Sequence, residues 1–232
     1  MKIINNLIGL IIILLLVSCS KQEKVSIVQE KNIETQMIEA FKEGYEELEN
    51  GDVLFAAKKF NEAELLYPQS DWAPKAALMA AYSYYSQDYY YDAEYELKRF
   101  LKIYPNQKNT PYAHYLLGMV YYEKIVDEKK DLEPLLMAEK KFKFIEKNYP
   151  NSDFALDASY KLDLIKDYLA SKEMYIGIHY MKKKKWIAAI NRFKNVVNLY
   201  QETSFIDEAL HRLVELHYKL GLIEESQKYA SL

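Results

Sequence analysis

Few side chains in this sequence have the type and spacing that enzyme chemistry requires. Glu208-x-x-His211 has the spacing of a di-iron ligand pair on a helix, but that site needs a second copy and further facing carboxylates, which the sequence does not offer. There is no glycine-rich phosphate loop, no H-E-x-x-H and no G-x-S-x-G. We therefore expect no catalytic residue, no metal and no cofactor, and we expect the histidines to be polar residues on helix surfaces.

The single cysteine has a position that suits covalent lipid attachment. A short positive start is followed by an apolar run over residues 7–17, which is too short to cross a bilayer core of roughly 30 Å. The run ends in Ser18-Cys19, and it resembles the lipobox of bacterial lipoproteins. That resemblance implies a signal peptide at 1–18 and a diacylglycerol and N-acyl chain on Cys19, which together form a stable anchor. The alternative is an uncleaved anchor or a structural cysteine.

Two clusters suit binding rather than catalysis. The run Lys182–Lys185, before Trp186, is either a solvated turn or a contact with an acidic partner or an anionic membrane surface. The chain has 22 tyrosines, and seven of them fall between Tyr82 and Tyr95. Tyrosine combines a large apolar area with a hydroxyl, which suits a peptide-binding surface, although it also suits a repeat core. The net charge of −3 is too small to indicate nucleic-acid binding.

These residues are positioned by an internal repeat. Gly44, Ala81 and Gly118 are 37 residues apart, and Gly177 begins a later copy. An alanine follows the small residue by 12 positions in most copies, and an eight-residue insertion is predicted near 127–134. We expect the small residues to allow close helix approach, and the large ones at Phe60, Leu97, Phe142 and Phe193 to fill the space between repeats. Pro68, Pro105 and Pro150 are predicted to stop the second helices, with Gln201 in the place of a fourth proline.

The pattern predicts only helices. It resembles the tetratricopeptide repeat, so the expected fold is an all-α, right-handed α-solenoid of about five tetratricopeptide-like helix pairs. The expected helices are 34–49, 52–66, 71–86, 89–103, 110–125, 134–148, 152–170, 171–183, 186–200, 204–219 and 221–230.

Several segments resemble one family of repeat lipoproteins more closely than the general repeat. They are Phe55–Phe60 with Tyr67-Pro68, Ser70–Ala76, Tyr112–Gly118, Tyr149–Ala155, and above all Glu173–Met181 leading into Trp186–Arg192. The sequence resembles the BamD family of the outer-membrane β-barrel assembly machinery over roughly residues 10–232. It departs from the family at Lys182–Lys185, where Arg or Gly is usual, and at Gln201.

The resemblance implies a non-catalytic lipoprotein on the periplasmic face of the outer membrane. Its domains would be a removed signal peptide (1–18), a lipidated cysteine and polar tether (19–33), N-terminal repeats that bind clients (34–150) and C-terminal repeats that dock a partner (151–232). The implied partners are unfolded outer-membrane β-barrel proteins, the POTRA region of BamA, other lipoproteins of the same machinery, and the membrane through the lipid anchor, with no nucleic acid.

From this we predict two contact sets. Client contact is assigned to Tyr45, Trp72, Tyr82, Tyr85 and Tyr89, and BamA contact to Lys184, Lys185, Trp186, Asn191 and Arg192. Arg192 suits a carboxylate partner because its guanidinium can bind bidentately. The alternatives are a repeat lipoprotein that serves cell-wall, pilus or division machinery, a wall hydrolase with a helical solenoid, and a solute-binding lipoprotein.

Overall fold

The computed structural model describes residues 32–125 and 132–232. The chain divides into two compact units, Met1–Asn32 and Ile33–Leu232, and the second contains every described residue except Asn32. The predicted signal peptide, Cys19 and nearly all of the predicted tether lie outside the described residues, as does most of the predicted insertion near 127–134.

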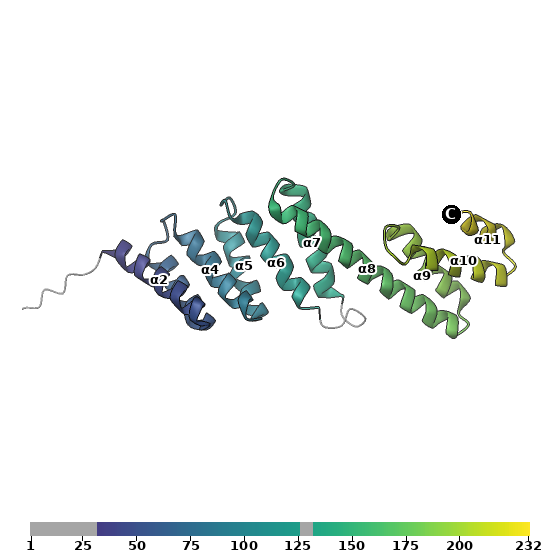
Figure 1. The fold of residues 1–232 in the computed structure, drawn as a ribbon, viewed down its shortest axis with the longest axis horizontal. Coiled ribbons are helices and arrows are strands. Elements are labelled where there is room, and N and C mark those ends of the chain that lie inside the picture. Colours follow the sequence, from purple (N-terminus) through teal and green to yellow (C-terminus); the bar gives the residue numbers. More distant parts are fainter. Residues whose placement is uncertain (1–31, 126–131) are drawn as a thin grey trace, which may run out of the picture. The chain divides into compact units, whose positions relative to one another are not determined.

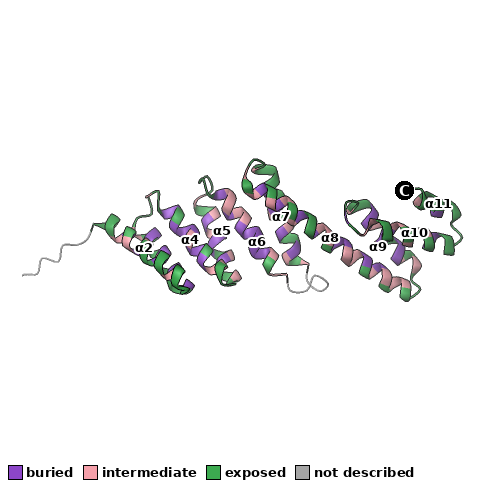
Figure 2. Ribbon diagram, viewed as in Figure 1, coloured by how far each residue is buried: buried purple, intermediate pink, exposed green. Residues whose placement is uncertain are grey.

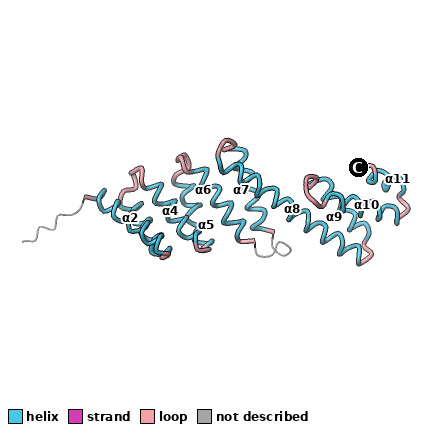
Figure 3. The backbone as a smooth tube through the Cα atoms, viewed as in Figure 1, coloured by secondary structure: helices cyan, strands magenta, loops and turns pink. Residues whose placement is uncertain are grey.

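All regular structure in the described residues is α-helical (Figures 1 and 3). Each helix packs against the next one in the chain, so the helices form the pairs α2/α3, α4/α5, α6/α7, α8/α9 and α10/α11. The prediction of an all-α solenoid of five helix pairs is therefore confirmed. The helices are α2 (Ile33–Asn50), α3 (Val53–Leu66), α4 (Ala73–Ser86), α5 (Tyr90–Ile103), α6 (Thr110–Glu123), α7 (Glu133–Asn148), α8 (Asp153–Lys182), α9 (Trp186–Leu199), α10 (Ile206–Lys219) and α11 (Ile223–Ala230).

The second helices of four pairs end in the same way. The residue after the last helical position is a tyrosine in α3, α5, α7 and α9. After three of these tyrosines, a hydroxyl three residues later donates to the tyrosine carbonyl, at 2.7 Å from Thr203 to Tyr200 and at 2.8 Å in the other two turns. The turn after α9 therefore closes without a proline, which explains why Gln201 at the expected proline position leaves the helix boundary unchanged.

Close packing within each pair depends on a small residue facing a large one. A β-carbon added to Gly44 would lie 3.0 Å from the ring of Phe60, and one added to Gly118 would lie 2.7 Å from Phe142. In the second pair, Ala81 takes the glycine position and the fully buried Leu97 takes the phenylalanine position. We had expected these large residues to fill only the space between repeats. They also fill the space between the two helices of one repeat. Phe60 does both, because it also clusters with Ala80 of the next pair.

One predicted helix boundary is wrong. The sequence predicted two helices at 152–170 and 171–183, but α8 is a single helix of 30 residues. No glycine or proline interrupts residues 169–176, and the buried positions Leu169, Ala170 and Met174 cross the expected break. Gly177 lies inside the helix because its missing side chain makes room for Phe193. The fourth repeat is therefore α8 with α9.

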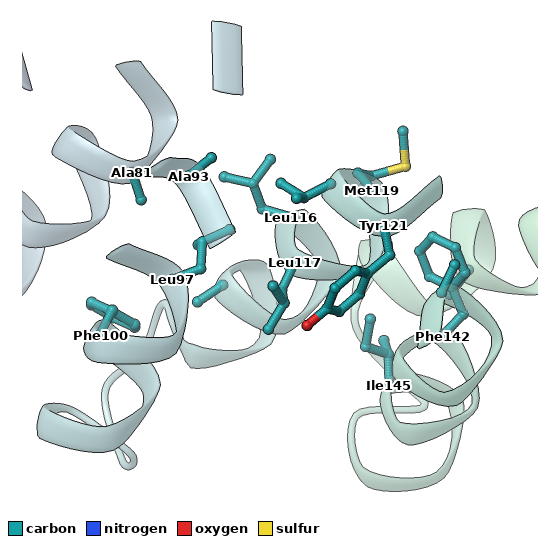
Figure 4. Close-up of a cluster of buried hydrophobic side chains, with 14 of the residues drawn as sticks. Ala81, Ala93, Leu97, Phe100, Leu116, Leu117, Met119, Tyr121, Phe142 and Ile145 are labelled. Atoms are coloured by element: carbon teal, nitrogen blue, oxygen red, sulfur yellow. The ribbon is translucent and has the colours of Figure 1, made fainter. Parts of the chain in front are cut away.

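Two hydrophobic clusters meet on α8. The larger one extends from α4 to Leu169, and Figure 4 shows side chains of α5, α6 and α7 meeting in it. The other starts at Ala170 and includes α9 and α10. Tyr200 packs against both clusters. In Figure 2 the buried positions lie where neighbouring helices face each other, as expected because most of the helices have 14 residues or fewer and would be only marginally stable alone.

A polar network joins the second helices α3 and α5. Arg99 donates from both terminal nitrogens to the Glu64 carboxylate, at 2.9 and 2.6 Å, and from Nε to Glu96 at 2.8 Å. The Tyr104 hydroxyl also donates to Glu64, at 2.9 Å. Since both glutamates are buried, this satisfied network fixes how two neighbouring repeats align.

Candidate peptide-binding face and C-terminal contact surface

Two adjoining grooves lie on the face formed by the first helices of the N-terminal pairs. The smaller, which we call the Trp72 groove, has a volume of about 290 Å³ between α2 and the start of α4. Phe41 meets Trp72 edge to face, with ring centroids 5.1 Å apart. Lys75 Nζ lies 4.6 Å from the centroid of the Trp72 ring. The residues lining the Trp72 groove are Ile38, Phe41, Lys42, Tyr45, Glu46 and Trp72.

The larger groove, which we call the Tyr82 groove, has a volume of about 560 Å³ and extends from α2 across α4 to the starts of α6 and α8. Phe41 lines both grooves, so they share one wall. Neither Lys75 nor Lys108 has an acidic partner among the described residues. The groove therefore offers an apolar, aromatic surface with two ammonium groups that no described carboxylate neutralises, which suits a segment that is apolar and carries negative charge. Its lining is Phe41, Lys75, Leu78, Met79, Tyr82, Lys108, Asn109, Tyr112 and Phe154.

The wall of the Tyr82 groove continues into a group of half-buried tyrosines. Burial raises the pKa of Tyr112 to about 12, and the neighbouring Tyr82 and Tyr85 hydroxyls add to the shift. The Tyr112 ring packs on Phe154 with centroids 5.3 Å apart. Tyr115 also packs on Phe154, and its hydroxyl donates to Asp157 at 2.6 Å. The raised pKa values of Tyr112 and Tyr115 keep both phenols protonated at neutral pH, so they present aromatic area and hydroxyls rather than charge.

A second surface lies at the other end of the repeats, where α8 meets α9. Lys184 and Lys185 are exposed in the turn between the helices, and Trp186 begins α9 beneath Lys219 of α10, whose Nζ lies 4.3 Å from the ring centroid. Asn191 is exposed on α9. Arg192 is engaged within the chain, because its guanidinium donates to both Glu173 oxygens, at 3.0 and 3.3 Å.

The remaining residues that could do chemistry form no site. Glu208 accepts a hydrogen bond from Arg212 at 3.3 Å, and His211 is exposed. Across 32–125 and 132–232, no three His, Cys, Asp or Glu residues are grouped so that they could hold a metal. Among those same residues, no helix combines the length and apolar character needed to cross a membrane.

Comparison with known proteins identifies the family. The sequence pattern of the family described as "Outer membrane lipoprotein" (YfiO) matches residues 33–232. The chain belongs to this family. It is 36% identical to the "Outer membrane protein assembly factor BamD" of Rickettsia prowazekii over 232 residues, which cover 100% of this chain and 91% of that protein.

Two further relatives carry the same description. The protein of Caulobacter vibrioides is 38% identical over 185 residues, 80% of this chain, and the chain spans 61% of its length. The protein of Vibrio cholerae is 25% identical over 238 residues, 98% of this chain and 96% of that protein. The resemblance to the BamD family that the sequence showed is therefore confirmed.

In this member of the YfiO family, the five predicted client residues fall into four places. Tyr45 and Trp72 line the Trp72 groove together, and Tyr82 lines the Tyr82 groove. Tyr85 lies beside that groove, where its hydroxyl interacts electrostatically with Tyr112. Tyr89 lies in neither groove, because it caps the start of α5 in the turn after α4.

Sequence reasoning missed several lining residues, and the 37-residue repeat contained a signal for some of them. Tyr45 and Tyr82 are one repeat apart, and so are Phe41 and Leu78, which both line the Tyr82 groove. Phe154 had a signal as well, because it follows Pro150 by four positions, as Trp72 follows Pro68, but the insertion before α7 hides this match from a simple 37-residue count.

Proposed function

We propose that the chain is a non-catalytic scaffold of the machinery that folds β-barrel proteins into the outer membrane. Membership of the outer membrane lipoprotein family supports the location, and the descriptions of its relatives as assembly factors support the role. Lipidation of Cys19 would hold the repeats at the periplasmic face of that membrane. A Cys19→Ser variant tests the anchor, because it should release the protein from the membrane fraction.

In this proposal the N-terminal grooves receive unfolded outer-membrane proteins. The observation that carries it is the pair of adjoining aromatic grooves that share Phe41. Aromatic contacts contribute about 0.5–1.5 kcal/mol each beyond area burial, and the two free lysines add attraction for a carboxylate. Shallow grooves of this size give a short residence time, which a scaffold needs if it is to pass the client on.

Peptide binding by two double variants tests the client role. A labelled aromatic peptide from the end of an outer-membrane barrel protein should bind the full chain, and Tyr45→Ala together with Tyr82→Ala should weaken it about 10-fold, roughly 1.4 kcal/mol. Tyr91→Ala with Tyr95→Ala is the matched control, because these exposed α5 tyrosines line neither groove. Equal loss in both double variants would contradict a groove-specific contact.

The C-terminal repeats would dock the barrel-forming subunit BamA through its POTRA region, with Arg192 and Asn191 at the contact. Arg192→Glu should weaken co-purification of BamA while helical circular dichroism stays unchanged. Glu173→Gln is the informative companion, because it frees Arg192 without removing it. Co-purification that persists in Glu173→Gln supports direct contact by Arg192. Equal loss in both variants shows that the Arg192–Glu173 pair only holds α8 against α9.

The competing function is a repeat lipoprotein that serves cell-wall, pilus or division machinery, and it differs only in the partner. Mild-detergent extraction of the tagged protein separates the two. A large barrel protein with POTRA domains in the extract supports the proposal, whereas wall-synthesis proteins in its place would refute it.

A further inference from the structure

The turns between the helices of the last two repeats form an edge of unusual composition, which we call the basic edge. Lys182 ends α8 and Lys183–Lys185 form the turn between α8 and α9, and the α10–α11 turn lies 37 residues further on. The two turns are joined by Lys219, whose ammonium lies over Trp186. The basic edge consists of Lys182, Lys183, Lys184, Lys185, Trp186, Lys219, Leu220, Leu222 and Ile223.

The fold does not require lysines there. The left-handed backbone position of this turn is held by Gly51 and Gly221 in two repeats and by Asp88 in another. Lys184 adopts it with φ of 58°, a conformation that costs a residue with a β-carbon about 1 kcal/mol relative to glycine. A lysine therefore stands where glycine would be more stable, and the packing of the turn does not account for it.

The charges of the basic edge are not neutralised within the chain. None of the four lysines at 182–185 has an acidic partner among the described residues. Glu224 and Glu225 lie in the first turn of α11, next to Ile223 in the chain, and neither makes an ion pair with these lysines. Five ammonium groups, counting Lys219, therefore face solvent in a protein whose net charge is −3.

Apolar side chains are exposed within the same edge. Leu220, Leu222 and Ile223 are 37%, 40% and 45% exposed, and Trp186 is partly exposed beneath Lys219. Lysine is depleted and arginine enriched in protein–protein interfaces, whereas lysines beside tryptophan and leucine are typical of surfaces that bind the headgroup region of a bilayer. Each lysine near an anionic bilayer contributes about 1 kcal/mol of attraction.

We propose that the basic edge binds the surface of a membrane rich in anionic phospholipid. The lysines would contact headgroup phosphates, and Trp186 with the leucines would enter the glycerol region. The proposal is independent of the client grooves. It assigns Lys184, Lys185 and Trp186 to lipid instead of to BamA, so the test must separate these two partners.

The two tryptophans of the chain make this test direct. In a Trp72→Phe variant, Trp186 is the only tryptophan, and the full chain reconstituted in vesicles then reports on the basic edge alone. With 30% phosphatidylglycerol and brominated lipid in phosphatidylcholine, we expect Trp186 emission to shift to the blue and to fall at least 2-fold. Replacement of Lys182–Lys185 by glutamine should abolish the change, as should 1 M salt. A matched variant replaces four other lysines by glutamine and should retain the emission change. These lysines are all exposed on α5 and α7, and they are Lys102, Lys140, Lys143 and Lys147.

The contrary outcomes are equally specific. Trp186 emission that is the same in anionic and in pure phosphatidylcholine vesicles would overturn the proposal and leave the lysines to a protein partner. Equal quenching of Trp72 in a Trp186→Phe variant would also overturn it, because the anchored protein would then meet the bilayer without regard to the basic edge.

Discussion

The N-terminal and C-terminal repeats share their internal packing but differ in the surface they present. Glycine faces phenylalanine in the first and third pairs, and again in the fourth, where a β-carbon on Gly177 would lie 2.6 Å from Phe193. The turn that holds Asp52 or Asp88 in the N-terminal repeats corresponds, between α8 and α9, to the run of four lysines Lys182–Lys185. Packing positions are thus constrained by volume, while turn and groove positions remain free to serve different partners in each half.

The two halves also have separate hydrophobic clusters, joined by α8. If this division is real, damage to one cluster should leave the other folded. Phe193→Ala removes a fully buried ring from the C-terminal cluster and should cost about 3–5 kcal/mol. Hydrogen exchange should show lost protection in α9 and α10, with α4 to α6 unchanged.

Phe142→Ala is the reciprocal variant, because Phe142 lies in the N-terminal cluster and is equally buried. In this variant, hydrogen exchange should show loss of protection in α6 and α7 before the other helices. If both variants unfold all helices together, the comparison fails and the repeats form a single cooperative unit.

A smaller effect tests whether a small residue must face a large one within each helix pair. Alanine normally stabilises a helix interior relative to glycine by about 1 kcal/mol. At Gly118 we expect the opposite, a loss of about 1–2 kcal/mol in urea unfolding, because the new β-carbon would meet Phe142 at 2.7 Å. Adding Phe142→Leu reproduces the natural pair Ala81/Leu97 and should restore most of the loss. Losses that simply add in the double variant would argue against direct contact.

The sequence predicted the parts of the fold that depend on local signals. The helix starts marked by Pro74 and Pro111, and the helix ends just before Tyr67 and Tyr104, are encoded within a few residues. The continuity of α8 could not be predicted by counting repeats, because it depends on Met174 and Gly177 packing against another helix. Similarly, Tyr45 and Trp72 were recognisable as aromatic surface residues, whereas the place of Phe154 in the Tyr82 groove depends on how α8 packs beside α6.

The N-terminal half should also be the more sensitive to acid. Burial lowers the pKa of His114 to about 4, and the nearby Lys141 ammonium adds to the shift. The unfolded chain, with an ordinary histidine pKa of about 6.5, then binds more protons, so stability falls as the pH drops from 6.5 towards 4. Because His114 is partly exposed, we expect a loss of about 1 kcal/mol between pH 7 and 5. His114→Phe should remove this loss in urea unfolding, whereas His211→Gln, at an exposed site, should not. An unchanged pH dependence in His114→Phe would show that other groups cause it.

The smallest effect concerns the turn position that distinguishes the halves. Lys184→Gly should stabilise the chain by about 0.5–1 kcal/mol, because glycine adopts a φ of 58° without a steric cost. Gly221→Lys, at the equivalent position, should destabilise by a similar amount, and Lys183→Gly serves as the control with ordinary backbone angles. Thermal unfolding measures all three. If Lys184→Gly is more stable yet shows weaker attraction to anionic vesicles, the C-terminal turn gives up stability to keep its charge. A destabilised Lys184→Gly would mean instead that the lysine side chain itself supports the turn.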